Sequence, residues 1–136
     1  MAAALVPELY VSDLARSLAF YCDLAGFAVR YQRPEEAFAY IAMGDAEVML
    51  EEPVGRTWLT GALERPFGRG INLQIAVPDA DRLFGVFCEA GATIINELEQ
   101  KSYLRRRDTI SVRQFVVADP DGYLLRFAQI ISEQPS

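Results

Sequence analysis

The sequence contains no histidine and only two cysteines among its 136 residues. Without histidine, Ser-His-Asp and Cys-His catalysis are excluded, and carboxylates are the only good metal ligands that remain. Cys22 and Cys88 lie far apart and fit no metal-ligand spacing. Each falls in a predicted amphipathic helix, where a cysteine usually serves as a small buried hydrophobic residue.

The sequence also lacks an apolar run long enough for a signal peptide or a membrane span. Its net charge is −6, and its one basic run, Arg105-Arg106-Arg107, is short. Proteins that bind nucleic acids normally present a broad basic face. We therefore expect a cytoplasmic protein that binds neither membranes nor nucleic acid. The acidic balance weakly favours a cationic ligand.

What the chain does have is a hydrophobic fraction of 51%, which is sufficient for the core of one ordinary domain. It also repeats itself at an offset of 66 residues, and a register this long is not a chance match. The matching pairs are Val11 with Val77, Asp13 with Asp79, Arg16 with Arg82 and, after the loss of one residue, Gly26 with Gly91.

Each half is predicted to contain a strand, a helix and three further strands. In the first half the strands are residues 5–11, 27–32, 37–43 and 46–51, and Ser12 or Asp13 begins a helix that ends at Gly26. In the second half a helix runs from Asp79 to Gly91, and strands cover residues 93–97, 110–117 and 123–129. The proline- and glycine-containing residues 52–69 are expected to be a linker, and residues 98–108 a second long loop.

These elements predict one α+β domain over residues 1–136. Module one covers residues 1–52, the linker 53–69 and module two 70–132. Each module has the order βαβββ. We expect two curved mixed sheets around a cleft, with helices covering one face of each sheet.

Three sequence motifs resemble the vicinal-oxygen-chelate superfamily, also called the glyoxalase/bleomycin-resistance/dioxygenase group. They are VSDLARSLAFY at residues 11–21, LAGF at residues 24–27 and DPDGYLL at residues 119–125. Together with the repeat, the resemblance covers nearly the whole chain. It implies the fold, but not one activity, because the superfamily includes lyases, dioxygenases, epimerases, thiol transferases and binding proteins.

The resemblance implies where a metal would bind in the enzymes of this family: the first and fourth strands of each module. The corresponding positions here are Val6, Glu51, Asn72 and Arg126. Only Glu51 is an ordinary ligand, since valine has no lone pair and arginine has no acceptor and a permanent positive charge. We therefore expect no metal and no other cofactor.

Arg126 lies in a run, residues 119–127, that closely resembles the corresponding stretch of the bleomycin-resistance proteins. Those proteins have lost the metal and sequester the drug stoichiometrically. Pro7 lies where they carry a proline at the hinge of an exchanged first strand. The resemblance thus implies a homodimer with clefts at the subunit interface. Alternatively, Pro7 simply begins an edge strand.

Alternation along the strands indicates which side chains face the cleft. Met49, Glu51, Asn72 and Arg126 are expected to face inward, and Phe38 and Tyr40 occupy alternate positions of one strand. The predicted ligand-binding residues are Phe38, Tyr40, Met49, Glu51, Trp58, Asn72, Tyr103 and Arg126. Other roles stay open: Glu51 and Arg126 as an ion pair, Trp58 as an anchor for the linker, and Phe38 and Tyr40 as core or dimer contacts.

The leading functional hypothesis is a metal-free binding protein that sequesters a bulky, aromatic, partly cationic antibiotic such as bleomycin, giving resistance without turnover. A second hypothesis is a divergent enzyme of the same superfamily acting on a small metabolite, with Glu51 as general base and Arg126 holding an anionic substrate. A third is a non-catalytic stress or regulatory module. The absence of an evident second acid–base residue favours a binding protein over an enzyme.

Overall fold

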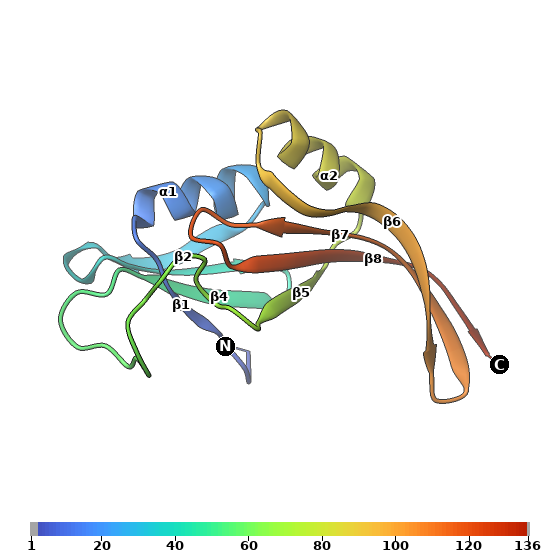
Figure 1. The fold of residues 1–136 in the computed structure, drawn as a ribbon, viewed down its shortest axis with the longest axis horizontal. Coiled ribbons are helices and arrows are strands. Elements are labelled where there is room, and N and C mark those ends of the chain that lie inside the picture. Colours follow the sequence, from blue (N-terminus) through green and yellow to red (C-terminus); the bar gives the residue numbers. More distant parts are fainter. Residues whose placement is uncertain (1–2, 136) are drawn as a thin grey trace. The chain divides into compact units, whose positions relative to one another are not determined.

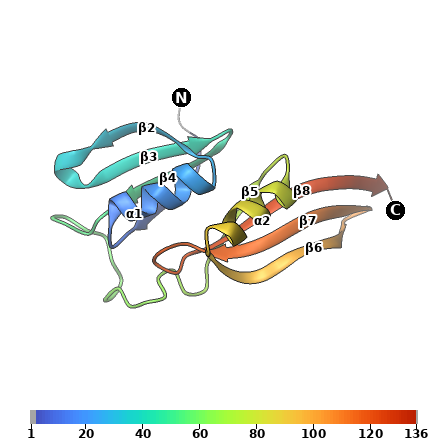
Figure 2. The same ribbon diagram turned by 90° about the horizontal axis from the view of Figure 1, so that it is seen from above.

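The structure is a computed structural model that describes residues 3–135. It consists of two compact units: unit 1 extends to Phe67, and unit 2 begins at Gly68. Each unit contains one four-stranded sheet with a helix on one face (Figures 1 and 2). None of the helices in the described part of the chain is long and apolar enough to cross a membrane.

Unit 1 has the predicted order of a strand, a helix and three strands. Its elements are β1 (Glu8–Tyr10), α1 (Leu14–Leu18), β2 (Ala28–Arg33), β3 (Phe38–Met43) and β4 (Ala46–Glu51). The strand order in the sheet is β1-β4-β3-β2. β1 is parallel to β4, and the other pairs are antiparallel. The parallel pair is possible because the intervening helix carries the chain back across the sheet.

The first helix begins and ends where the sequence predicts. The Asp13 side chain accepts a hydrogen bond from the backbone N–H of Arg16, which satisfies a free donor of the first turn. After Leu18 the helix continues as a π-helical segment, Ala19–Leu24, and Gly26 follows at φ +99°. Tyr21 from this segment is fully buried between the helix and the sheet. The helix thereby covers one face of the sheet and leaves the other face without a covering helix (Figure 2).

Unit 2 repeats this arrangement with longer strands. Its elements are β5 (Asn72–Ala76), α2 (Ala80–Glu89), β6 (Thr93–Arg105), β7 (Asp108–Ala118) and β8 (Leu124–Pro135), and the sheet order is β5-β8-β7-β6. Phe87 of α2 packs on Phe115 and Phe127 of the sheet, with ring centroids 5.9 and 5.6 Å away. All three rings are buried, and they form the core of this unit.

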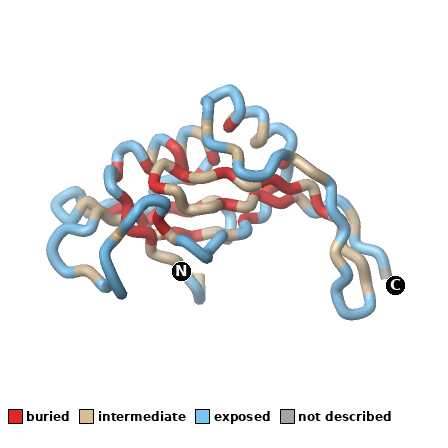
Figure 3. Tube along the Cα trace, in the orientation of Figure 1, coloured by how far each residue is buried: buried red, intermediate tan, exposed pale blue. Residues whose placement is uncertain are grey.

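The expectation that residues 98–108 form a long loop is wrong. β6 continues through this segment to Arg105, and β7 starts at Asp108, so that only Arg106 and Arg107 form the turn. Arg105 makes two hydrogen bonds to Asp108, of 2.9 and 2.6 Å, and Ser102 bonds Ser111 across the strands at 2.7 Å. These polar cross-strand pairs stabilise a two-stranded ribbon that contains few buried apolar residues (Figure 3). Because it has few apolar residues, the segment resembles a loop in the sequence.

The segment between β4 and Gly68 contains no helix or strand. Within unit 1 it is fastened by hydrogen bonds. The backbone N–H of Leu14 donates to Glu52 at 2.8 Å, and the backbone N–H of Trp58 donates to the Tyr10 hydroxyl at 2.9 Å. The segment is therefore ordered against β1 and α1 of its own unit.

The α+β fold class is confirmed. Two βαβββ repeats each form a mixed sheet, and neither sheet closes into a barrel. Buried residues are concentrated in the central strands of each sheet (Figure 3).

A candidate ligand site on the open sheet face of unit 1

The candidate site lies on the face of the unit 1 sheet opposite α1. Residues that stand directly opposite one another in neighbouring strands project from the same face. One row across the four strands consists of Tyr31, Tyr40, Met49 and Glu8. The next row consists of Arg33, Phe38, Glu51 and Tyr10. Four of the predicted ligand-binding residues therefore form a block at the centre of one face.

The aromatic rings of this face form a continuous group. Tyr31 stacks on Tyr40 with centroids 5.1 Å apart and an interplanar angle of 16°, and its ring is 6.0 Å from that of Phe38. Phe38 is 1% exposed and Tyr40 6%, whereas Tyr31 is 49% exposed. Tyr31 is thus the ring that a flat molecule can reach, and the two predicted rings support it from beneath.

Hydrogen bonding fixes the orientation of Tyr40. Its hydroxyl donates to Glu47, and Arg30 pairs with the same carboxylate at 3.3 Å. The bond to Glu47 raises the pKa of Tyr40, and the same bond is the main reason that the pKa of Glu47 is lowered. Glu47 therefore stays ionised, and Tyr40 stays protonated as its donor. A ring held in this way offers Tyr31 a rigid surface on which to stack.

Two carboxyl groups, Glu8 and Glu51, lie at the β1–β4 side of the same face. Burial raises the pKa of Glu51, and a hydrogen bond and charge repulsion from Glu8 raise it further. Glu36 adds to the repulsion, while Arg33 opposes it. A carboxyl pair in this arrangement binds a proton more readily than an isolated glutamate, and it attracts a cation when ionised.

Arg33 lies over the aromatic group. Its guanidinium carbon is 3.9 Å from the centroid of the Phe38 ring and 5.9 Å from that of Tyr31. Its Nε also pairs with Glu36 at 2.8 Å. A guanidinium at this distance from a ring face is a cation–π contact. The face thus combines aromatic rings, carboxylates and the guanidinium of Arg33.

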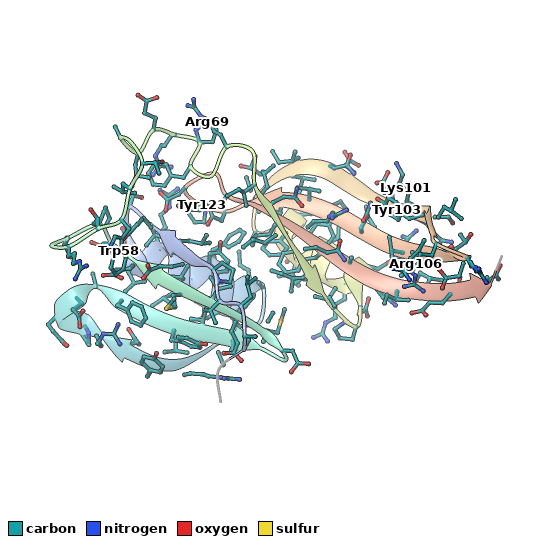
Figure 4. The ribbon with its side chains drawn as sticks, turned by 90° about the horizontal axis from the view of Figure 1, so that it is seen from below. Trp58, Arg69, Lys101, Tyr103, Arg106 and Tyr123 are labelled. Atoms are coloured by element: carbon teal, nitrogen blue, oxygen red, sulfur yellow. The ribbon has the colours of Figure 1, made fainter. Side chains whose placement is uncertain are left out.

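Trp58 adjoins the Tyr10 end of this face through its backbone, as described above. Its side chain is 69% exposed, and the guanidinium of Arg56 lies 5.0 Å from its ring. Figure 4 shows the indole on the loop that follows β4. The backbone of Trp58 therefore anchors the loop, while the indole stays accessible.

The corresponding face of unit 2 has a different chemistry. Asn72 stands opposite Leu124, and Gln74 stands opposite Arg126. Arg126 has a buried Nε that has no hydrogen-bond partner among the described residues. Tyr103 lies on the β6–β7 ribbon (Figure 4), opposite Ile110, and its hydroxyl accepts a bond of 2.6 Å from Gln114. From Val116, which is paired with Arg126, to Ile110 is six residues along β7, or about 20 Å. The backbone of Tyr103 is thus distant from Arg126, but its hydroxyl reaches back to Gln114, which lies two residues from Val116.

Sequence reasoning missed two residues of the unit 1 face, Tyr31 and Arg33. The signal was available, because both lie on β2 at alternate positions, with the same spacing that identified Phe38 and Tyr40. Ligand binding by the eight predicted residues stays a prediction, as does the ion pair between Glu51 and Arg126.

The strand ladders revise one equivalence between the modules. Glu8 and Gln74 are 66 residues apart and hold the same place in the repeat. Glu8 stands opposite Met49, and Gln74 stands opposite Arg126. The ladder counterpart of Arg126 is therefore Met49, and that of Glu51 is Ala128. The two fourth-strand positions that the resemblance implies, Glu51 and Arg126, are thus not equivalent in the two units.

At the ligand positions that the family implies, the chain carries Val6, Asn72 and Arg126 and, in β4, Met49 or Glu51. The set therefore offers at most one carboxylate, besides a neutral amide, a thioether and a fixed positive charge. These residues do not fit a divalent ion. Among residues 3–135 there is also no group of three or more histidine, cysteine or acidic side chains that could hold one.

Comparison with known proteins agrees with this architecture. The model of the Glyoxalase/Bleomycin resistance protein/Dioxygenase superfamily matches residues 3–127, and the chain belongs to that family. The chain is 27% identical over 134 residues to proteins named bleomycin resistance protein from Geobacillus stearothermophilus and Staphylococcus aureus. The match covers 93% of this chain and 96% of each relative.

Two solved structures were also found by comparison. TioX from Micromonospora sp. ML1 superposes with a TM-score of 0.73 at 23% identity, over 94% of this chain and 98% of that one, and so shares the fold. A superfamily member from Vibrio splendidus 12B01 is 40% identical, covering 91% of this chain and 95% of its own, with a TM-score of 0.44.

Proposed function

We propose that this protein binds and sequesters a bulky, aromatic, partly cationic small molecule, with bleomycin as the first candidate. The observation that carries the proposal is the open face of the unit 1 sheet. It presents the exposed Tyr31 ring on a rigid aromatic base, beside the carboxyl groups of Glu8 and Glu51. The relatives named bleomycin resistance protein support the same class of ligand.

The physical reason is the fit between this face and such a ligand. A flat heteroaromatic group gains from stacking on an exposed ring, and a cationic group gains from carboxylates nearby. The exposed indole of Trp58, fastened beside Tyr10, can cover the ligand from the loop. Sequestration needs affinity and copy number, and it needs no catalytic group.

Calorimetric titration with bleomycin, metal-free and copper-loaded, tests the proposal, with Trp58 fluorescence followed in parallel. We expect one ligand per chain at micromolar affinity or tighter, together with quenching of the single tryptophan. Absence of heat and of quenching would remove bleomycin as the ligand.

Variants locate the site. Tyr31→Ala is expected to weaken binding by about five-fold or more, because stacking of a heteroaromatic base on an aromatic side chain is worth roughly 1–3 kcal/mol. Tyr31→Phe keeps the ring and should bind nearly as well as the wild type. Glu51→Gln should weaken the binding of a cationic ligand, and Glu97→Gln, an exposed change on β6, is the matched control. Equal loss in Glu51→Gln and Glu97→Gln would place the ligand elsewhere.

A second candidate function is an enzyme that acts on a small metabolite. The observation that favours it is the raised pKa of Glu51, because a carboxyl group that titrates closer to neutrality is a better general acid or base. Turnover of a metabolite that is lost in Glu51→Gln would support this candidate. Saturable binding without turnover would support sequestration.

We also propose that the protein is a cytoplasmic homodimer that exchanges β1 at Pro7. The backbone N–H of Met49 donates to the Pro7 carbonyl at 2.9 Å, the first bond of the β1–β4 ladder. The same bond would form with the first strand of a partner. Sedimentation analysis gives the oligomeric state, and a monomer at working concentration would contradict the dimer.

A further inference from the structure

The contact between Arg33 and Phe38 has a consequence for the ligand. Phe38 is almost fully buried although it lies on the open face of the sheet, and the guanidinium of Arg33 sits 3.9 Å from its centroid. Tyr31 borders the same space, with its centroid 5.9 Å from the guanidinium. Glu36 supplies the counter-charge at 2.8 Å. A ring face, a second ring and a carboxylate are the components of a site for an organic cation.

We propose that the Phe38 face is a subsite for an organic cation of the ligand, and that Arg33 occupies it as an internal stand-in when no ligand is bound. This inference rests on the proposed function, since it concerns the same sheet face. It adds a specificity-determining residue, and it names the group that the subsite takes: a guanidinium or a substituted ammonium.

The displacement of Arg33 is physically inexpensive. Its ion pair with Glu36 joins two side chains that are 42% and 51% exposed, and pairs in that situation contribute little to stability. The arginine stem is long and flexible, so its head can move into solvent while the backbone of β2 stays in the ladder with β3. An incoming cation would then take both the Phe38 face and the carboxylate of Glu36.

Self-occupation lowers the apparent affinity for a cation. A site that is free in only a fraction of molecules binds its ligand more weakly by that fraction. Removal of the guanidinium should therefore strengthen the binding of a cation. The strength of cation–π contacts corresponds to a gain of about two- to thirty-fold.

The test uses tetramethylammonium chloride as the cationic probe and tert-butanol as an uncharged molecule of similar size. Binding is followed by NMR from the ring protons of Phe38 and Tyr31, on the full chain, in the wild type and in Arg33→Met. We expect Arg33→Met to bind tetramethylammonium about five-fold more tightly or better, with little change for tert-butanol. Arg33→Gln is a second variant with a polar side chain and the same expectation.

Charge alone must be separated from displacement. Arg16→Met removes an equal charge from the exposed surface of α1 and should leave the affinity for tetramethylammonium unchanged. The gain in Arg33→Met should also persist in 1 M sodium chloride, where the Debye length is about 3 Å and long-range attraction is screened. A gain that disappears in salt, or that appears equally with tert-butanol, would overturn the proposal.

The wild-type protein supplies a measurement that needs no variant. The δ protons of Arg33 should resonate upfield of their ordinary position because of the Phe38 ring current, and they should return toward it as tetramethylammonium is added. Ordinary chemical shifts of these protons in the free protein would contradict the proposal that Arg33 occupies the Phe38 face. Bleomycin titration of the wild type tests the proposed function separately, so a failure of that function with a positive tetramethylammonium result leaves the cation subsite in place.

Discussion

The two units share one βαβββ frame but carry different chemistry on their open sheet faces. In unit 1 the face holds stacked rings, two neighbouring carboxyl groups and Arg33. In unit 2 the equivalent strands present Asn72, Gln74 and Arg126. The helix-side faces, by contrast, are apolar in both units, with Ile41 and Leu50 in one and Phe115 and Phe127 in the other. The helix-side face thus supplies apolar core residues in both units, whereas the open face carries different side chains in each.

The largest expected effect comes from the buried face. Phe127 packs on Phe87 and Phe115 and is fully buried, so Phe127→Ala should lower the free energy of unfolding by about 3–5 kcal/mol. Tyr31→Ala, on the half-exposed open face, should cost about 1 kcal/mol or less. Urea unfolding followed by circular dichroism measures both. Equal losses of unfolding free energy would contradict the conclusion that the helix-side face contributes more to stability than the open face.

The same experiment sharpens the comparison between the units. Trp58 is the only tryptophan, and it lies in unit 1. If the chain is one cooperative domain, as its length predicts, Phe127→Ala in unit 2 should shift the Trp58 fluorescence transition together with the circular dichroism transition. A fluorescence transition that stays at the wild-type midpoint would mean that the units unfold independently.

A smaller loss of stability is expected when alanine replaces either of two glycines with positive φ. A Cβ on Gly68, at φ +71°, would lie 2.4 Å from the Tyr123 ring, whereas one on Gly44, at φ +58°, would meet no atom within 4 Å. Gly44→Ala should cost about 1–2 kcal/mol from backbone strain alone. Gly68→Ala should cost about 2–4 kcal/mol, because steric overlap with Tyr123 is added. Thermal unfolding distinguishes them, and equal losses would mean that the Tyr123 ring moves aside freely.

The smallest effect concerns the pH dependence of unit 1. The pKa of Glu51 is raised above its ordinary value of 4.5, so the folded state binds a proton more tightly than the unfolded chain does. The stabilisation is present at low pH and is lost as pH rises above about 4.5 through the raised pKa. Glu51→Gln removes this loss. Its stability relative to the wild type should therefore increase from pH 4 to pH 7.

Urea midpoints at the two pH values measure that change, and Glu97→Gln on the exposed surface of β6 is the control. A constant difference between Glu51→Gln and the wild type across this range would show that the pKa of Glu51 is not raised in the folded state.

Local sequence patterns predicted much of the fold and part of the candidate site. The repeat located the start of both helices. Asp13 and Asp79 each accept a hydrogen bond from the backbone N–H three residues further along the chain. Alternation placed Phe38 and Tyr40 on one face of their strand and Met49 and Glu51 on one face of another, and the ladder then pairs them. The β6–β7 ribbon was missed because its strands are held by polar pairs such as Ser102 with Ser111, which carry no apolar period.

The relations across strands could not be read from the chain. Whether Met49 or Glu51 corresponds to Arg126 depends on ladder register, and a shift of two residues keeps the same side chains on the same face. The alternation of side chains along a strand therefore cannot reveal a two-residue shift of register. The stacking of Tyr31 on Tyr40 and the position of Arg33 over Phe38 depend on that register and on rotamers as well.

The sequence by itself determined the family, the two βαβββ modules and the set of residues on each face, because helix caps, turns and apolar periods are local properties of the chain. Only the tertiary structure decided which of those residues meet: that Tyr31 is the accessible ring, that Glu8 and Glu51 interact, and that Arg33 covers Phe38. These contacts join separate strands, and their geometry exists only after the strands have paired.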